Sequence, residues 1–266
     1  MNKISVAIAT YNEEENIAKC LKAVKDWVDE IVVVDGSSTD KTREIAKKLG
    51  AKVIKTTNKP IFHINKNIAI NACHGDWILQ LDADEIVPPQ LRDEILSVVK
   101  QESKINKPIA YWLKRKNYFL GRYLKKGGQY PDPVIRFFRK GKAILPAKDV
   151  HEQMTVNGEV GWLQNDLIHW ATPKFSRYLL RERRYSTLKA KELLDERLPI
   201  NLWVFLKYIF WLPKKTFFMI FIRHKGFMDG WQGFVFAFFS GFHFIWAYFK
   251  YLRLRLKKVD IAKEWR

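Results

Sequence analysis

Short apolar runs alternate with polar segments over residues 1–90 of the chain. The apolar runs have the length and composition of buried strands, and they cover residues 4–9, 30–35, 52–55 and 77–81. The segments between them, which reach about Trp27, Gly50 and Ala72, have the pattern of helices, and we expect Asn12 to cap the first. Strands and helices in this rhythm predict an α/β fold, a parallel sheet with helices on both faces.

The pattern changes after a further predicted helix at residues 90–102. Residues 110–113 and 134–138 are short β-like runs, and a Gly127-Gly128 turn lies between them. We expect these runs to form antiparallel strands that extend the parallel sheet.

From residue 176 onward the pattern is helical. Residues 176–198 form a highly charged segment closed by Pro199, and an apolar run at 202–212 is stopped by Pro213. We therefore divide the chain into a domain at residues 1–175 and a helical region at residues 176–266.

The segment from Gly230 to Phe249 contains no Lys, Arg, Asp or Glu. Its twenty residues are just long enough to cross a bilayer as a helix, but Gln232, Ser240 and His243 interrupt it. Small residues recur at every fourth position, which suits close helix packing: Gly233, Ala237 and Gly241. We predict helices that lie in the membrane interface, and a true span is the alternative.

Basic and aromatic residues are concentrated in the same C-terminal part. The chain has a formal net charge of +19, and residues 176–266 carry 19 basic against 7 acidic residues. Nineteen aromatic residues lie between Asn201 and Phe249, where they form apolar runs. Because no recognised nucleic-acid motif is present, the predicted partner is an anionic membrane surface and not nucleic acid.

Carboxylates follow two of the predicted strands directly. Asp35 ends the second strand, and Asp82 and Asp84 follow the fourth as a D-x-D sequence. The carboxyl ends of parallel strands meet at one edge of a sheet, where open α/β folds bind their ligands. Two aspartates two residues apart on extended chain point the same way and can hold a divalent cation. The alternative is a strand that ends in a solvated acidic loop.

Four motifs in residues 1–90 resemble those of family 2 glycosyltransferases, which have the GT-A fold. They are Ala9-Thr10-Tyr11-Asn12-Glu13, Val33-Val34-Asp35-Gly36-Ser37-Ser38-Thr39-Asp40, Lys66-Asn67, and Gly75-Asp76-Trp77 running into Asp82-Ala83-Asp84-Glu85. The second half is similar to the branch that adds a hexose to the heptose of the lipopolysaccharide inner core. The residues that carry this second resemblance are His151-Glu152, Ile168-His169-Trp170 and Gly226-Phe227-Met228-Asp229-Gly230. The resemblance implies a GT-A (Rossmann-like), mostly parallel sheet with helices on both faces, followed by a C-terminal helical, membrane-associating region.

The resemblance places the donor contacts at the ends of the first strands. Asp35 would accept a hydrogen bond from a uracil N–H, and Thr10, Tyr11 and Glu13 would contact the base and the ribose. Lys66 would approach the diphosphate as a point charge. Simpler interpretations stay open, since Asp35 suits a helix cap, Tyr11 suits packing and Lys66 suits a solvated helix surface.

The same resemblance implies a divalent cation, Mg²⁺ or Mn²⁺. Asp84 would contact this cation directly, and Asp82 would support it through the ribose or water. His169 resembles the late histidine that some GT-A enzymes use as a further ligand. Its alternative is a histidine that packs beside Trp170.

The resemblance also implies inversion at the anomeric carbon, and an inverting transfer needs a base that takes a proton from the acceptor hydroxyl. Glu152 is the candidate, with Asp149 and Asp132 in reserve, and its alternative is an acid at the start of a helix. Arg136 could bind a phosphate, but we expect it to be a basic residue on the outer side of a strand.

These features predict an inverting, metal-dependent hexosyltransferase that moves a single sugar from a nucleotide-sugar donor, a UDP-hexose, to a membrane-associated acceptor. The acceptor would be lipopolysaccharide core, another cell-envelope glycan or a lipid-linked glycan. The Gln-x-x-Arg-Trp motif of processive synthases is absent, which favours single addition. The alternatives are a polyprenyl-phosphate glycosyltransferase and, outside the enzymes, a membrane-bound scaffold with a degenerate transferase fold.

The cysteines and the N-terminal residues bear on the compartment. Cys20 and Cys73 give neither a disulfide framework nor metal-ligand spacing, and the run after Met1 is too short for a signal peptide. We therefore expect a cytoplasmic protein, peripheral or monotopic at the inner face of the cytoplasmic membrane.

Overall fold

The computed structural model describes residues 2–59, 61–101, 108–146 and 153–257. Contacts divide the chain into two compact units, of which the first comprises residues 1–117 and 131–171 and the second comprises residues 118–130 and 172–266. The segment 118–130 therefore groups with the helical residues and not with the sheet that flanks it in sequence.

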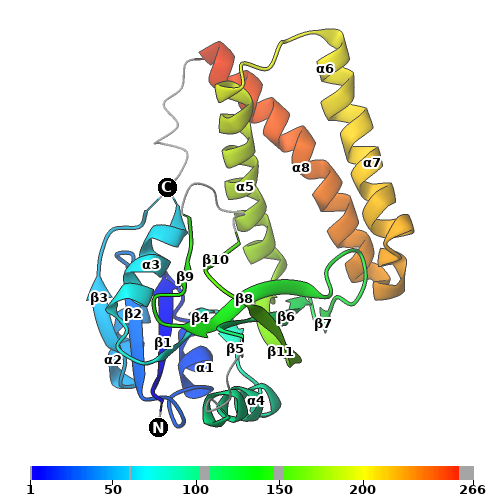
Figure 1. Cartoon of the computed structure of the whole chain (residues 1–266). Coiled ribbons are helices and arrows are strands. Elements are labelled where there is room, and N and C mark those ends of the chain that lie inside the picture. Colours follow the sequence, from blue (N-terminus) through cyan, green and yellow to red (C-terminus); the bar gives the residue numbers. More distant parts are fainter. Residues whose placement is uncertain (1, 60, 102–107, 147–152, 258–266) are drawn as a thin grey trace. The chain divides into compact units, whose positions relative to one another are not determined.

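Four parallel strands form one half of the sheet in the first unit, and they lie side by side in Figure 1. They are β1 (Ile4–Thr10), β2 (Glu30–Asp35), β3 (Lys52–Lys55) and β4 (Trp77–Asp82). The helices that connect them are α1 (Ile17–Lys22), α2 (Thr42–Lys48) and α3 (Phe62–Ala72). The sequence prediction of a parallel α/β sheet is confirmed.

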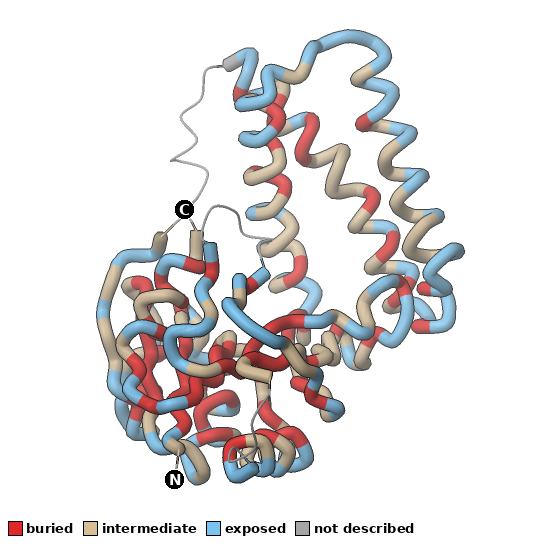
Figure 2. Tube along the Cα trace, viewed as in Figure 1, coloured by how far each residue is buried: buried red, intermediate tan, exposed pale blue. Residues whose placement is uncertain are grey.

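The two faces of β1 pack into different parts of the core. Ile4, Val6 and Ile8 join a cluster with residues of α1, α2 and α4 (Pro89–Lys100). Ala7 lies in a second cluster with residues of α3. This alternation follows from the two-residue repeat of a strand, and it places helices on both faces of the sheet. The buried positions of Figure 2 concentrate in these strands.

Antiparallel strands extend the sheet beyond β4, as predicted. They are β5 (Glu85–Ile86), β6 (Ala110–Phe119), β7 (Arg122–Tyr123), β8 (Asp132–Arg139) and β11 (Val160–Thr172). Within the described residues the sheet has nine strands in the order β3-β2-β1-β4-β8-β6-β11-β5, with β7 paired to β6. A separate ladder joins β9 (Ala143–Ile144) to β10 (Thr155–Val156).

The predicted role of Asn12 as a helix cap is wrong. Asn12 adopts a φ of 54°, and its side-chain oxygen accepts a hydrogen bond from the Thr39 backbone N–H at 2.8 Å. Its own N–H donates to Ser38 Oγ at 2.9 Å. Asn12 tolerates the left-handed conformation that this turn needs, and it ties the end of β1 to the loop after β2. The helix begins only at Ile17.

The second unit is built mainly from helices. The charged segment forms α5 (Phe175–Asp195), and the apolar runs form α6 (Leu202–Leu206), η1 (Lys207–Trp211), α7 (Leu212–Phe218) and η2 (Met219–Arg223). A short η3 (Gly226–Asp229) leads into α8 (Gly230–Lys257). Figure 1 shows the α6–α7 segment and α8 side by side.

The prediction that Pro213 stops the apolar run at residues 202–212 is wrong, because helical structure continues from Leu202 to Arg223. A π-helical segment at Lys207–Trp211 precedes the proline. A wider turn relieves the clash of the proline ring with the preceding carbonyl and accommodates the missing N–H donor.

The small residues of α8 provide the predicted close packing. A methyl group added at Gly241 would lie 2.7 Å from the carbonyl oxygen of Pro213. At Gly233 it would lie 1.9 Å from the carbonyl oxygen of Gly226. Larger side chains at these two positions would separate the helices. Among the described residues, no helix combines the length and the apolar character that crossing a bilayer requires.

Candidate functional site

The carboxylates predicted at the strand ends lie at one edge of the sheet. In the β1 register, Thr10 pairs with Asp35 of β2, and Ala9 pairs with Asp82 of β4. Neighbouring strands are about 4.8 Å apart, so the backbones of Asp35 and Asp82 are separated by roughly 10 Å across β1. A nucleoside diphosphate is long enough to contact both positions.

Asp35 is completely buried at this edge. One carboxylate oxygen, Oδ1, accepts a hydrogen bond from the Ser38 N–H at 3.0 Å and lies 3.5 Å from Arg43 Nε. The other oxygen, Oδ2, is buried and has no hydrogen-bond partner among the described residues. Thr10 Oγ1, on the neighbouring strand, is also buried without a hydrogen-bond partner among the described residues. Unsatisfied buried acceptors are costly, so these atoms indicate a site for a ligand donor.

The other predicted nucleotide contacts lie at or next to the end of β1. Tyr11 is 41% exposed, which leaves its ring accessible to a base or a ribose. Glu13 accepts a hydrogen bond from Asn16 Nδ2 at 2.7 Å, and its backbone N–H donates to Thr42 Oγ1 at 2.8 Å. The Glu13 backbone is thus fixed against the start of α2.

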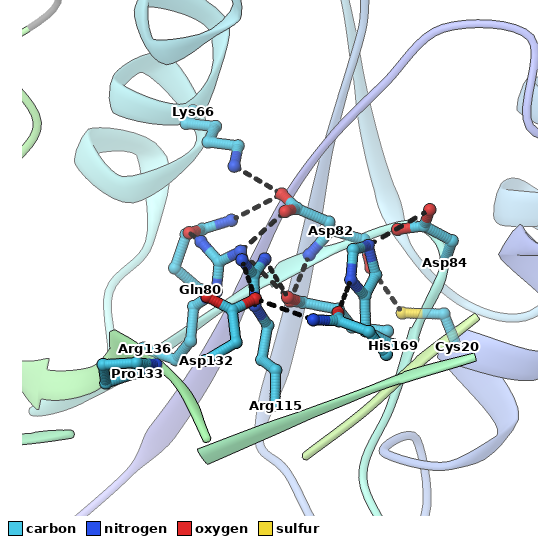
Figure 3. Close-up of polar contacts among 12 residues, drawn as sticks. Cys20, Lys66, Gln80, Asp82, Asp84, Arg115, Asp132, Pro133, Arg136 and His169 are labelled. Carbon is cyan, nitrogen blue, oxygen red and sulfur yellow. Dashed lines mark hydrogen bonds and ion pairs between the residues drawn. The ribbon is translucent and has the colours of Figure 1, made fainter. Parts of the chain in front are cut away.

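Two cations hold Asp82. Lys66 Nζ lies 2.5 Å from Oδ1, and Arg136 Nη2 donates to Oδ2 at 2.6 Å, as Figure 3 shows. Burial disfavours a charge on Asp82, but Arg136 and Lys66 outweigh it and hold the pKa of this carboxyl well below its usual range. The interpretation of Lys66 as a solvated lysine is wrong, since the residue is buried.

Arg136 is a buried residue of the site, and the expectation that it faces outward is wrong. Its side chain is 7% exposed, and Nη2 also donates to Glu85 Oε1 at 2.9 Å, while Nη1 donates to Gln80. Glu85 is fully buried and lies 3.4 Å from Arg115 Nη1. The sequence contained a signal for this arrangement, because a charge inside the apolar run Val134–Phe138 needs a buried partner.

A chain of polar contacts leads from Arg115 to His169. Arg115 Nη2 lies 2.7 Å from Asp132 Oδ2, to which Asn117 Nδ2 also donates at 3.1 Å. The amide orientation of Asn117 directs its oxygen to His169 Nδ1, 2.6 Å away. Because an amide oxygen can only accept, Nδ1 carries a proton, and in the neutral form of the imidazole Nε2 has a lone pair that could bind a cation. Asp132, one of the reserve bases, is therefore engaged in this chain.

The lone pair of His169 faces Asp84. Nε2 lies 3.6 Å from Asp84 Oδ2, and Trp170 N–H donates to the Asp84 carbonyl at 2.8 Å, which fixes the two residues side by side. Two ligands at about 2.1 Å from one cation are roughly 3 to 4 Å apart, so the spacing fits a shared cation. In the described part of the chain, no group of three or more His, Cys, Asp or Glu is arranged to hold a metal ion. The Asp84–His169 pair would thus need further ligands from a bound molecule.

The predicted base, Glu152, lies outside the described residues, as does the reserve Asp149. The structure brings together Lys66, Asp82, Asp84 and His169, and it places Thr10 beside Asp35 in the same sheet edge. Sequence reasoning missed Gln80, Glu85, Arg115 and Asn117, whose roles depend on strand pairs that are distant in sequence.

The comparisons with known proteins decide the family. The model of glycosyl transferase family 2 matches residues 5–152, which include all of the parallel half of the sheet except Ile4. The chain belongs to this family. As a family 2 glycosyltransferase it is 30% identical to the uncharacterized glycosyltransferase RT0209 of Rickettsia typhi, over 98% of this chain and 89% of that protein. It is 27% identical to the lipopolysaccharide core biosynthesis glycosyltransferase LpsC of Rhizobium meliloti, over 88% of this chain and 89% of that one.

Solved structures support the fold of this glycosyltransferase. The crystal structure of residues 1–349 of S. aureus TarS in complex with UDP is similar, with a TM-score of 0.50 and 16% identity. The match covers 96% of this chain and 92% of that one. The chain therefore has the GT-A-like α/β sheet with a C-terminal helical region, as the sequence predicted.

Proposed function

We propose that this family 2 glycosyltransferase transfers a single sugar, with inversion, from a UDP-hexose donor to a membrane-associated acceptor. The observation that carries the donor assignment is the buried Asp35 Oδ2, which has no hydrogen-bond partner among the described residues. A uracil N3–H provides the donor that this oxygen lacks. Thr10, Tyr11 and Glu13 would contact the base and ribose from the end of β1.

The Asp84–His169 pair supports a divalent cation, Mg²⁺ or Mn²⁺, in this reaction. One oxygen and one imidazole nitrogen suit such a cation, and the donor diphosphate would supply further oxygen ligands. The bound cation would stabilise the negative charge of the departing diphosphate. Lys66 and Arg136 would add positive charge nearby while they hold Asp82 in place.

Glu152 would serve as the base that takes the proton of the acceptor hydroxyl as the new glycosidic bond forms. The similarity to LpsC and the basic, aromatic helical unit support a lipopolysaccharide or lipid-linked acceptor at the inner face of the cytoplasmic membrane. A peripheral or monotopic position would bring the enzyme to such an acceptor.

A thermal-shift experiment tests the donor assignment. UDP with Mn²⁺ should raise the melting temperature by several degrees, because a ligand at about 100 times its Kd stabilises the native state by roughly 2.7 kcal/mol. UDP methylated at N3 lacks the N–H that Asp35 would accept, and it should stabilise much less. Asp35→Asn should abolish this discrimination. Equal stabilisation by UDP and its N3-methyl analogue would refute the role of Asp35.

The metal site gives a second prediction, which concerns Asn117. Asn117→Ala should weaken Mn²⁺ binding in the presence of UDP by roughly 10- to 100-fold, because the amide fixes the tautomer and orientation of His169. Isothermal titration calorimetry measures this affinity without turnover. Asn165→Ala is the matched control, since Asn165 of β11 donates to Glu94 of α4 and should not affect the metal. Unchanged Mn²⁺ affinity in Asn117→Ala would contradict the proposed ligand role of His169.

A further inference from the structure

The helices of the second unit expose large apolar side chains to an unusual degree. Trp203, Trp211 and Trp231 are 80%, 64% and 60% exposed. We call the following exposed residues of the α6–η1 segment and α8 the aromatic face: Trp203, Phe210, Trp211, Trp231, Phe234 and Phe238. In Figure 2 the α6–α7 segment is coloured mainly as exposed and intermediate. Contiguous apolar exposure of this kind marks an interaction surface.

On α8 the spacing places the residues of the aromatic face on one side of the helix. Trp231, Phe234 and Phe238 follow the three- and four-residue steps of a single helical stripe. The ring of Phe234 lies 5.7 Å from that of Phe217 and 5.8 Å from that of Phe221. The stripe of α8 therefore adjoins the α7–η2 segment, and the two helices present a shared surface.

The polar side chains of α8 point to its other side, where they are used within the unit. Gln232 Nε2 donates to the Leu120 carbonyl at 3.2 Å, and His243 Nδ1 lies 3.1 Å from Glu182. Lys250 Nζ donates to Ser186 Oγ at 2.8 Å on α5. The contacts of Gln232 and His243 explain two of the three polar interruptions of the apolar run. Because the polar side chains of α8 bind within the unit, its exposed aromatic residues lie on the side of the helix that faces outward.

The charge of the same segment identifies the partner. Residues 202–256 contain eight Lys or Arg and a single carboxylate, Asp229. Asp229 is 2% exposed, and its side chain accepts hydrogen bonds from the backbone N–H groups of Lys125 and Lys126. No exposed carboxylate therefore lies on the described helices from 202 to 256. A second copy of the chain would bring the same positive charge to the face, whereas an anionic bilayer complements it.

We propose that the aromatic face lies in the interfacial region of an anionic phospholipid bilayer, with the α6–η2 segment and α8 parallel to the membrane plane. This inference rests on the proposed function, because an enzyme with a membrane-bound acceptor has to bind the membrane that carries it. Exposed tryptophans beside basic residues are the composition of helices that lie in an interface. The rings enter the boundary of the acyl chains, and the Lys and Arg side chains contact lipid phosphates.

Vesicle sedimentation of the full-length protein tests the proposal. The wild-type chain should sediment with vesicles that contain phosphatidylglycerol, and sedimentation should fall as salt is raised. A triple variant, Trp203→Ser/Trp211→Ser/Trp231→Ser, should bind these vesicles at least tenfold more weakly. Trp162→Ser is the matched control, because Trp162 is 50% exposed on β11 of the first unit. It should bind as the wild type does.

Two results would overturn the proposal. One is unchanged vesicle binding by the triple variant. The other is a wild-type dimer that the triple variant converts to a monomer, with no vesicle binding by either protein, which would make the face an interface between copies. The UDP thermal shift of the same preparations separates this inference from the proposed function. Stabilisation by UDP without vesicle binding would reject the membrane face alone, and vesicle binding without stabilisation would reject the donor assignment.

Discussion

Asp84→Ala should lower the rate of sugar transfer by roughly 100- to 1000-fold and abolish the effect of Mn²⁺ on UDP binding. Removing one preorganised electrostatic contact to the developing charge typically costs this much in catalysis. The expected loss is specific to the cation, because the structure places Asp84 Oδ2 3.6 Å from His169 Nε2, the second proposed ligand. The measurements are initial rates of UDP release and the calorimetric affinity for UDP with and without Mn²⁺.

Two further variants make this result interpretable. Asp26→Ala removes a carboxylate that is 80% exposed beside Lys25, and it should leave both measurements unchanged. Glu152→Gln should retain Mn²⁺-dependent UDP binding and lose transfer, since a base acts on the acceptor and not on the donor. If Asp84→Ala kept wild-type binding of UDP with Mn²⁺, the metal role of the D-x-D sequence would be wrong. If Glu152→Gln kept wild-type transfer, Glu152 would not be the base.

The four parallel strands and the position of Asp35 and Asp82 at their ends could be predicted because they depend on local patterns. An apolar run that ends in a carboxylate marks both the strand and its carboxyl end. Local patterns gave the wrong prediction for the cap at Asn12 and for the stop at Pro213. Asn12 bonds to the loop after β2, 27 residues away in sequence at Thr39, and Pro213 is accommodated by a π-helical segment. Neither feature has a local signal in the chain.

The position of Arg136 inside an apolar run indicated a buried partner, but the identity of its partners could not be predicted, for a related reason. Its members come from β4, β5, β6 and β8, which meet only through the antiparallel half of the sheet. In the sequence, Glu85 directly follows Asp84, and no role was assigned to it. In the structure it turns inward and receives both Arg136 and Arg115. Arg136 therefore helps to fix Asp82 although it lies outside the four motifs.

Arg136→Met should destabilise the protein by about 3–5 kcal/mol, because it leaves the carboxylates of Asp82 and Glu85 without their shared buried cation. For a chain of this size the melting temperature should fall by on the order of 10 °C. Arg136→Lys should lie between this variant and the wild type, since a single ammonium cannot replace the forked contacts to both carboxylates and Gln80. Thermal unfolding followed by circular dichroism measures the change.

The pH dependence of this stability distinguishes an electrostatic role from loss of packing. In the wild type the folded-state pKa of Asp82 is lowered, so its contribution is present above an unfolded pKa of about 3.9 and is lost as the pH falls through the folded value. In Arg136→Met, Asp82 loses the largest of the charges that lower its pKa and keeps Lys66, so its folded-state pKa should rise toward the unfolded value, and stability should depend less on pH in the acid range than it does in the wild type. Arg92→Met, which removes an exposed partner of Asp93, should leave the wild-type profile unchanged. A destabilised Arg136→Met variant with the wild-type pH profile would mean that Arg136 acts through packing, and that Lys66 alone sets the charge state of Asp82.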